Sequence, residues 1–452
     1  MSKNYDYDYI IIGSGPAGRT AALRLATAKK KVAIVDFQNF GGTEINTRDL
    51  PYELSLNFAK SYHDFGTSPA ASGSSCHFNF PTLQSTIETQ ISIKRDSLVK
   101  EFKEKHITLI HGFAHFLDKE TIAVGEYRYT AKNFILSSGS KLKATEIAGL
   151  DSVKFWSPDN VLSQKRLPKF VFVVGGGPTG VQIAEYFAML GVGVIIMERG
   201  SHLLPREDED VSSAISDYFT RVLGITIVTN AKVTAITEDY ASKIVVFMNG
   251  TNEKMVRVDS IVLATGSEPF LDYGLENAGV DYKRTGIIVD KYFNTTAKNI
   301  YAIGDATSGD SSTERSSLEA NILATNLLHR QKIVIKQSDL PRCINISEEI
   351  ATIGLNERDL LARDIKCKRS VVYLKDIPTL TSPIYQHGFV KLLTDHSGRL
   401  LGATIVAPGA KSIIGELSLA KSHKQSLESL ASITHPANSP ATAITLAAKK
   451  LL

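Results

Sequence analysis

Two glycine-rich turns, each placed between an apolar strand and a helix, constrain the fold of this chain more than any other feature. The first turn, GSGPAG at residues 13–18, follows the apolar run 9–12. In such a turn the first glycine permits a tight bend, the second lets a pyrophosphate approach the backbone, and the third lets the helix lie close to the strand. The free N–H groups at the helix start then face the phosphates. The segment therefore predicts a dinucleotide site.

The sequence contains this unit twice. Residues 31–35 predict a second strand ending in Asp36, a carboxylate placed to accept hydrogen bonds from a ribose. Residues 170–198 repeat the pattern, and in both copies the acid follows the first glycine by 23 residues. One glycine turn is a weak signal, but two copies in register predict two nucleotide sites. The candidate ligand residues are Gly13, Gly15, Pro16, Ala17, Gly18 and Asp36 in the first unit, and Gly175, Gly177, Gly180 and Glu198 in the second.

The acid of the second unit bears on which nicotinamide cofactor binds there. Glu198 would accept hydrogen bonds from a free 2′-hydroxyl and repel a 2′-phosphate, which favours NAD over NADP. Arg199 stands beside it, and a guanidinium can accommodate that phosphate. NAD is therefore favoured, while NADP stays open.

Three further apolar runs end on small residues, as strands do where they meet a ligand. Residues 134–136 lead into Ser138 and Gly139, and residues 261–264 lead into Gly266. Residues 300–303 lead into Gly304 and Asp305, whose carboxylate is placed to bond to the hydroxyl chain of a cofactor. From Leu340 onward the pattern changes to a hairpin over 389–406 and a helix over 410–420, typical of an α+β domain that binds a partner or dimerises.

Composition excludes several classes of function. A formal charge of +4 over 452 residues, without a long Lys/Arg block, argues against binding to nucleic acid or an anionic membrane. No apolar run reaches the ~20 residues of a membrane span, and the polar start lacks the core of a signal peptide. Cys76, Cys343 and Cys367 are widely separated without a CxxC pattern, which favours a reducing compartment and no metal cluster. We expect a cytoplasmic protein.

Together these motifs resemble those of the two-dinucleotide flavoprotein disulfide reductases, the family of dihydrolipoamide dehydrogenase, glutathione reductase, mercuric reductase and the soluble transhydrogenase. The resemblance covers nearly the whole chain. It implies FAD in the first site, NAD(P)H in the second, and a C-terminal domain that forms a homodimer. The motifs that carry it, besides the two glycine turns with their acids, are Gly42-Thr43, Gly112-Phe113-Ala114, Ser138-Gly139, Ala264-Thr265-Gly266, residues 301–305, Glu349-Ile350-Ala351 and residues 388–391.

By this resemblance the chain is an α/β protein with two Rossmann-like dinucleotide-binding domains and a C-terminal α+β dimerisation domain. The expected limits are 1–150 and 268–337 for the two parts of the FAD domain, 151–267 for the NAD domain and 338–452 for the dimerisation domain. The resemblance adds Gly42, Thr43, Ala114, Ser138, Gly139, Gly304 and Asp305 to the expected FAD site, and Val233 and Gly266 to the NAD site.

The departures from the family pattern fall on the chemistry. The family loop reads GGTCxNxGCxPSK, and here its two cysteines are Glu44 and Asp49 and its lysine is Glu53. The glutamate that pairs with that lysine is Gln182, and the acid of the C-terminal His-Pro-Thr-x-x-Glu motif is Pro440. Carboxylates cannot accept two electrons, so dithiol–disulfide exchange cannot occur in this loop.

One histidine of the family's proton relay remains. If His435 reaches across the dimer as in the family, it would face Asp49 or Glu44, and a nearby carboxylate would favour the imidazolium as a proton donor. The alternative is that His435 only packs before proline at a helix start.

The sequence leaves two functions open. The first is an FAD-dependent oxidoreductase that passes hydride from NAD(P)H through flavin to a small-molecule acceptor, which is a quinone, a dye or a second nicotinamide as in the transhydrogenase. The second is a redox-silent FAD/NAD-binding protein whose altered site has lost its activity. Reduction of the bound flavin by NADH separates the two.

Overall fold

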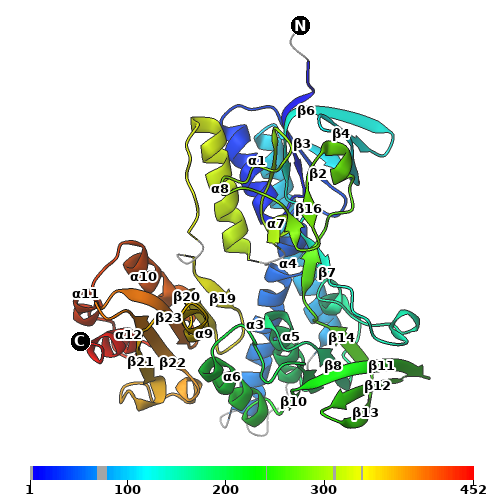
Figure 1. The fold of residues 1–452 in the computed structure, drawn as a ribbon. Helices are drawn as coiled ribbons and strands as arrows, with labels where there is room; N and C mark the ends of the chain where they lie inside the picture. Colours follow the sequence, from blue (N-terminus) through cyan, green and yellow to red (C-terminus); the bar gives the residue numbers. More distant parts are fainter. Residues whose placement is uncertain (1–3, 69–78, 241, 309–311, 337–339) are drawn as a thin grey trace.

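A computed structural model describes residues 4–68, 79–240, 242–308, 312–336 and 340–452. The chain forms three regions, each built around its own sheet (Figure 1). A seven-stranded sheet lies at the top of the view, a four-stranded sheet at the lower right, and a five-stranded sheet at the lower left. This arrangement confirms the predicted α/β class with a separate C-terminal α+β region.

The first sheet has the order β3-β2-β1-β6-β5-β4, with β18 pairing to β6. β1, β2, β3, β6 and β18 run parallel, so the late strand β18 completes a sheet begun at the N-terminus. Helices α1 and α8 lie side by side against it. The strands are β1 (Tyr7–Ile12), β2 (Val32–Asp36), β3 (Thr108–His111), β4 (Ala114–Asp118), β5 (Thr121–Val124), β6 (Tyr127–Leu136) and β18 (Ile300–Ala302), and the helices are α1 (Pro16–Thr27) and α8 (Thr313–His329).

The second glycine unit builds a parallel sheet of order β10-β9-β8-β14. A three-stranded antiparallel sheet, β11-β12-β13, is inserted in sequence between β10 and β14. The elements are β8 (Phe170–Val174), α5 (Pro178–Met189), β9 (Gly193–Met197), α6 (Glu209–Arg221), β10 (Thr226–Val228), β11 (Ala231–Asp239), β12 (Ser242–Asn249), β13 (Asn252–Val258) and β14 (Ser260–Leu263). The two nucleotide units therefore share one topology, as the sequence repeat predicts.

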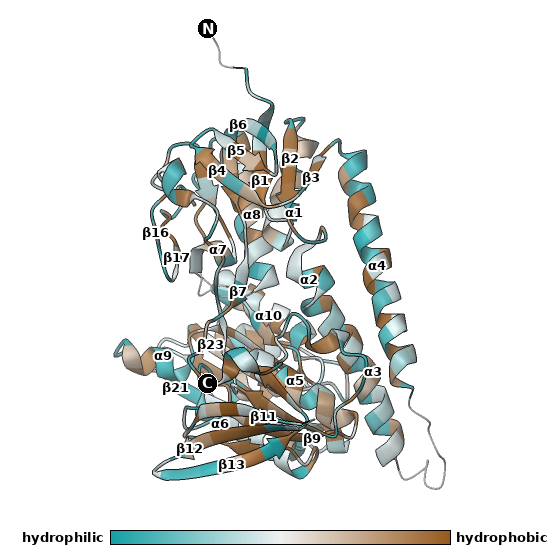
Figure 2. Ribbon diagram, turned by 90° about the vertical axis from the view of Figure 1, so that its right-hand side faces the viewer, coloured by the Kyte–Doolittle hydropathy of each residue, from teal (hydrophilic) through white to brown (hydrophobic). Residues whose placement is uncertain are grey.

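The long helix α4 (Phe80–Glu104) joins the cores of these two regions (Figure 2). Its first half packs Leu83 and Ile87 into the hydrophobic cluster around α5. Its second half packs Leu98 and Phe102 into the cluster beneath β1 and β2. Because one stiff helix contributes to both cores, it resists relative movement of the two nucleotide units.

The C-terminal sheet has the order β19-β20-β23-β22-β21 and is antiparallel. The predicted hairpin over 389–406 is present as β22 and β23. The elements are β19 (Arg342–Ile344), β20 (Ile350–Gly354), α9 (Glu357–Ala362), β21 (Lys368–Tyr373), β22 (Phe389–Thr394), β23 (Leu400–Val406), α10 (Ala410–Ser422), α11 (Leu427–Ser432) and α12 (Thr442–Lys449). The remaining helices and strands are α2 (Gly42–Asn46), α3 (Asp49–Thr67), β7 (Ser140–Leu142), β15 (Ser267–Pro269), β16 (Tyr282–Lys283), β17 (Gly286–Ile287) and α7 (Asp305–Ser308).

The residue pattern also predicts loops over 41–53 and 66–75, a helix over 86–105 and separate short strands at 127–129 and 134–136. Three of these predictions differ from the structure. Residues 41–53, expected to be a loop, are largely helical, since α2 covers 42–46 and α3 already starts at Asp49 and buries Tyr52. α4 starts at Phe80 rather than at the expected Thr86, because the Asn79 side chain caps it by accepting from the Thr82 N–H. The two short runs expected at 127–129 and 134–136 form the single strand β6. The predicted loop at 66–75 lies partly outside the described residues.

A buried lysine ties the second nucleotide region to the C-terminal sheet. The ammonium of Lys391 on β22 lies 2.6 Å from Asp208, 2.8 Å from Asp210 and 2.8 Å from Glu357. These three carboxylates are close enough to one another to hold a metal ion, but the ammonium already occupies the space between them.

Within the described part of the chain, no helix is long and apolar enough to span a bilayer.

Candidate functional site

The main pocket lies where the parallel strands of the first sheet end. Its wall takes Ile12 from the end of β1, Ser137 from beyond β6 and Ile303 from beyond β18. This is the carboxyl edge at which open α/β sheets bind nucleotides. Of the residues predicted for the FAD site, the pocket is lined by Gly13, Gly15, Pro16, Ala17, Asp36, Gly42, Thr43, Ala114, Ser138, Gly139, Gly304 and Asp305, together with Glu44 and Asp49.

The glycines of the first turn meet two requirements: close approach of the backbone at Gly13 and Gly18, and open space at Gly15. A Cβ on Gly13 would lie 2.1 Å from the Ser137 carbonyl oxygen, and one on Gly18 would lie 1.9 Å from the Gly13 oxygen. These two glycines let β1, β6 and α1 approach one another, so Gly18 acts by packing and does not line the pocket. A Cβ on Gly15 would meet no protein atom within 4 Å. Gly15 thus leaves free the space that a bound pyrophosphate needs.

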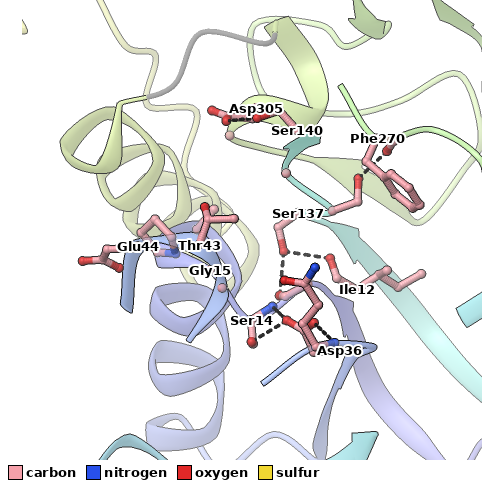
Figure 3. A pocket seen from close by; sticks show the side chains of 18 of the residues that line it. Ile12, Ser14, Gly15, Asp36, Thr43, Glu44, Ser137, Ser140, Phe270 and Asp305 are labelled. Carbon is pink, nitrogen blue, oxygen red and sulfur yellow. Dashed lines mark hydrogen bonds between the residues drawn. The ribbon is translucent and has the colours of Figure 1, made fainter. Parts of the chain in front are cut away.

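The acid at the end of β2 organises the turn. Asp36 Oδ2 accepts hydrogen bonds from the Ser14 N–H, at 2.8 Å, and from the Ser14 hydroxyl, as Figure 3 shows. The Ser14 oxygen in turn accepts from the Gly41 N–H at 2.8 Å. This chain of bonds holds the glycine turn against the loop that carries Thr43 and Glu44. Ser14 was not identified from the sequence, although its place inside the motif was a signal.

The other wall of the pocket comes from β7 and the segment after β18. The Ser140 hydroxyl donates to Asp305 Oδ2 at 2.9 Å (Figure 3). The N–H of Gly304 donates to Glu319 of α8 at 2.7 Å, and Arg315 holds that carboxylate at 2.7 Å. Asp305 is thereby fixed at the pocket wall, where its prediction as a ligand for a hydroxyl chain requires it.

The two carboxylates at the disulfide positions both line the pocket. Glu44 lies 3.1 Å from Arg19, and burial nevertheless raises the pKa of its carboxyl. Asp49 accepts a hydrogen bond from the Thr313 hydroxyl at the start of α8. Although the Asp49 side chain reaches the pocket, desolvation by the surrounding protein raises the pKa of its carboxyl. The negative charge of nearby Glu314 adds to this effect. Both groups therefore hold a proton to a higher pH than ordinary carboxyls do.

Glu53 and Gln182, which replace the lysine and glutamate that form a charge pair in the family, each bind a different partner in this structure. Glu53 is exposed and lies 3.5 Å from Lys411, and it does not line the pocket. Gln182 donates to the Asn345 carbonyl oxygen at 3.0 Å. The sequence reasoning missed Arg48, which does line the pocket and is held by Asp159. The sequence does indicate that this position is unusual, because the family loop has glycine where this chain has Arg48.

An aromatic cluster forms the wall near Asp36, and it was also missed. The ring centroids of Phe37, Phe113 and Phe270 lie 5.8–6.0 Å apart. Phe37 directly follows Asp36 in sequence. These rings offer apolar faces on which a flat base can stack.

The second glycine unit reproduces the first in detail. A Cβ on Gly175 would lie 2.3 Å from the Ala264 oxygen, one on Gly180 would lie 1.9 Å from the Gly175 oxygen, and one on Gly177 would meet nothing within 4 Å. Glu198 accepts from the N–H groups of Gly176 and Gly200, each at 2.8 Å. The carboxylate therefore occupies the place that Asp36 has in the first unit.

Two predicted NAD residues lie at different depths. Gly266 follows β14 with open space beside its α-carbon, where a ligand could approach. Val233 lies in β11, and its side chain is 4 % exposed inside a hydrophobic cluster. The Val233 side chain is therefore not accessible to NAD. A contact between NAD and the backbone of Val233 remains a prediction.

His435 has a carboxylate partner that the sequence did not reveal. Its Nε2 lies 2.9 Å from Glu416 of α10, and its Nδ1 lies 3.1 Å from the Thr445 hydroxyl. Pro440 does occupy the family's acid position, but a glutamate from a different helix supplies a carboxylate instead. His435 is also seven residues before α12, which begins at Thr442, so it does not stand at a helix start.

The cysteines lie away from the pocket where the structure describes them. Cys343 is exposed on β19, and Cys367 stands just before β21. Neither lines the pocket. Cys76 lies outside the described residues.

Two glycine units of one geometry, each with an acid at the end of its second strand, are typical of proteins with two dinucleotide sites, and this chain adds a C-terminal domain. Comparison with known families makes this more specific. The model described as pyridine nucleotide-disulphide oxidoreductase matches residues 7–324, and the model for the dimerisation domain of that family matches residues 340–448. The chain therefore belongs to the pyridine nucleotide-disulphide oxidoreductase family. Its members are FAD-dependent oxidoreductases that use NAD(P)H.

Individual relatives cover most of the chain. It is 30% identical to a mercuric reductase of Bacillus cereus over 431 residues, which is 92% of this chain and 67% of the reductase. It is 29% identical to a dihydrolipoyl dehydrogenase of Bacillus subtilis over 420 residues, 90% of each protein. Among solved structures, the Cu(II) complex of the flavoprotein disulfide reductase RclA from Escherichia coli aligns with a TM-score of 0.88 at 24% identity, covering 99% of this chain and 100% of RclA. LpdA from Mycobacterium tuberculosis aligns with a TM-score of 0.88 at 22% identity, covering 98% and 99%. The two structures support the fold.

The open middle glycines give a paired test of the two sites. We expect Gly15→Ala to lower FAD affinity at least tenfold, because its methyl group enters the phosphate space, while the melting temperature of the apoprotein stays within about 2 °C. Gly177→Ala should retain FAD and raise the KM for NADH at least tenfold. Flavin content after gel filtration and steady-state kinetics measure the two effects. Loss of FAD from both variants would contradict the assignment of separate sites.

Proposed function

We propose that this protein is an FAD-dependent NADH oxidoreductase that passes electrons to a non-disulfide acceptor. FAD, bound in the first pocket, supplies two-electron chemistry between the nicotinamide and the acceptor. The residues present suit it: Gly15 leaves the phosphate space open, Asp36 lies at the ribose position, and Asp305 is fixed on the opposite wall. The acceptor class we favour is a quinone, with a second nicotinamide as the alternative.

One observation carries this proposal. The two positions where the family pattern has its cysteines are occupied by Glu44 and Asp49, and both side chains line the pocket. Neither carboxylate can form or break a disulfide. The described cysteines, Cys343 and Cys367, stand on the C-terminal sheet region and are not in the pocket. Electrons would then leave the flavin directly.

NADH is the reductant that the second unit favours. Glu198 is buried and held by two backbone N–H groups, so its charge is fixed where a 2′-phosphate would lie. Arg199 beside it is exposed. Because a charge that water screens acts more weakly than a buried one, the Glu198 carboxylate should outweigh the exposed Arg199 guanidinium, and NADH should be used more efficiently than NADPH.

We further propose that the protein works as a cytoplasmic homodimer. The match of residues 340–448 to the dimerisation domain supports the dimer. Domain limits at 150, 267 and 337 would place β18 with the first sheet, to which it is hydrogen bonded. His435 would meet the pocket of the other subunit, with Glu416 keeping its ring in place.

Reduction of a quinone by NADH takes up one proton from solution, and the pocket contains a candidate donor. The raised pKa of Asp49 keeps more of its carboxyl protonated near neutral pH than an ordinary aspartate. Its position at the pocket wall beside Thr313 allows that proton to be replaced through the hydroxyl. Glu44, whose pKa is also raised, is the second candidate.

This role predicts a pH dependence with a definite sign. Quinone turnover should be high while Asp49 is protonated and fall as pH rises through its raised pKa. Asp49→Asn should lower the rate about tenfold at acidic pH and remove that fall. Ferricyanide accepts electrons without protons, so its reduction should be the same in both proteins. If Asp49→Asn leaves the quinone pH profile unchanged, the proton path is wrong.

The absence of sulfur chemistry can be tested directly by replacing every cysteine. We expect the triple variant Cys76→Ser, Cys343→Ser, Cys367→Ser to reduce quinone with NADH within twofold of the unmodified rate, because none of the three takes part. FAD content and the NADH-to-NADPH ratio of kcat/KM are measured in the same samples.

Two results would contradict the proposal. One is a tenfold loss of quinone turnover in the cysteine-free variant at full FAD content. The other is efficient turnover of lipoamide or glutathione disulfide by the unmodified enzyme. A flavin that NADH fails to bleach under anaerobic conditions would instead identify the redox-silent binding protein.

A further inference from the structure

The pocket contains one charged pair that the proposed proton path does not use. Arg48 donates from Nε to Asp159 Oδ1 at 2.8 Å and from Nη2 to Oδ2 at 3.4 Å. Both side chains line the pocket, and they are 15% and 37% exposed. The two residues come from segments far apart in the sequence, so the fold brings this pair together at the pocket wall.

Arg48 places a positively charged guanidinium at one end of the pocket. The lining residues that the structure describes include two basic side chains, Arg48 and Lys141. Lys141 lies over the Phe270 ring and pairs with Asp272 at 2.7 Å, at the aromatic end beyond Asp36. Arg48 instead shares its end with Glu44 and Asp49.

The parts of FAD can be matched to the two ends. Asp36 and the aromatic cluster suit the adenosine half, the glycine turn suits the pyrophosphate, and Asp305 suits the hydroxyl chain. The charged lining residues not yet matched are Glu44, Arg48, Asp49 and Asp159. The flavin ring, which carries the redox chemistry, therefore belongs there.

The guanidinium is fixed and stays charged. Burial alone would lower the pKa of Arg48, but its hydrogen bonds to Asp159 outweigh this and raise it. Asp159 takes two of the three nitrogens, and Nη1 makes no hydrogen bond to the residues that the structure describes. A held guanidinium with an unused N–H edge can bond to a ligand at little cost in side-chain entropy.

We propose that Arg48, oriented by Asp159, supplies the positive charge that stabilises the anionic, two-electron-reduced flavin in this pocket. This inference rests on the proposed function. Whenever Glu44 and Asp49 are ionised, their carboxylates alone would disfavour an anion beside them. A guanidinium at the same end offsets that repulsion and makes the bound flavin easier to reduce.

The competing interpretation is a structural brace. Thr47 also donates to Asp159, at 3.4 Å, and the Tyr52 hydroxyl reaches the Pro158 oxygen at 3.5 Å, so the pair could serve only to join two segments. A brace would affect the melting temperature and leave the flavin potential alone. The two interpretations therefore predict different measurements.

The test measures bound FAD in Arg48→Met, Arg48→Lys and Asp159→Asn holoenzymes. Arg221→Met, which removes an exposed arginine from the second nucleotide region, is the matched control. For Arg48→Met we expect a tenfold weaker preference for reduced over oxidised flavin, which is about 30 mV in midpoint potential for a two-electron couple. Sulfite, which forms an anionic flavin adduct, should bind at least tenfold more weakly. Arg48→Lys should keep most of both values, and Arg221→Met all of them.

Removing the charge of Asp159, the partner of Arg48, should shift the midpoint potential of the flavin in the opposite direction. In Asp159→Asn the guanidinium loses its counter-charge, so the potential should rise. Unchanged potentials and sulfite affinities in both Arg48→Met and Asp159→Asn, with only the melting temperature lowered, would overturn the proposal. If Arg48→Met does not retain FAD, the potential of Asp159→Asn decides alone. No acceptor is needed for these measurements, so turnover of a disulfide would refute the proposed function without altering them.

Discussion

The structure depends on a backbone contact that side chains cannot enter. At Gly13 and Gly18, strand β1, helix α1 and the residue after β6 meet so closely that any Cβ would overlap a carbonyl oxygen. Gly175 and Gly180 repeat this contact against Ala264 in the second unit. Because the contact fixes where each helix begins, it also fixes where its free N–H groups point. Both nucleotide sites follow from this one constraint.

The proposed chemistry depends on charged groups in the pocket rather than on sulfur. Carboxyls with raised pKa stand at the two cysteine positions, and a paired guanidinium, Arg48, stands between them in sequence. At the same time Glu53 has turned outward to Lys411. A pocket that carries both proton donors and a fixed cation suits a flavin that gives up electrons to an acceptor needing protons. The site thus differs from the family pattern in a coordinated way.

The sequence predicted whatever depends on local backbone rules. The glycine turns, their acids and the strand ends at Ser138 and Gly304 require particular residue types at fixed spacing. The structure brings those of the first unit, except Gly18, into one pocket. Contacts between distant segments were not predicted. The bond of Glu416 to His435 and that of Asp159 to Arg48 depend on how helices and loops pack, which no spacing reveals. Glycine and proline in residues 41–53 predict a loop, whereas the packing of Tyr52, which depends on distant segments, stabilises a helix there.

The central claim is that flavin is the sole redox centre. An anaerobic reductive titration of the holoenzyme tests it most directly, because each redox group takes up a fixed number of electrons. The account predicts complete reduction by about two electrons per FAD, with direct bleaching and no intermediate thiolate–flavin absorption band. Uptake of about four electrons per FAD, with such a band at the halfway point, would show a working disulfide and contradict it.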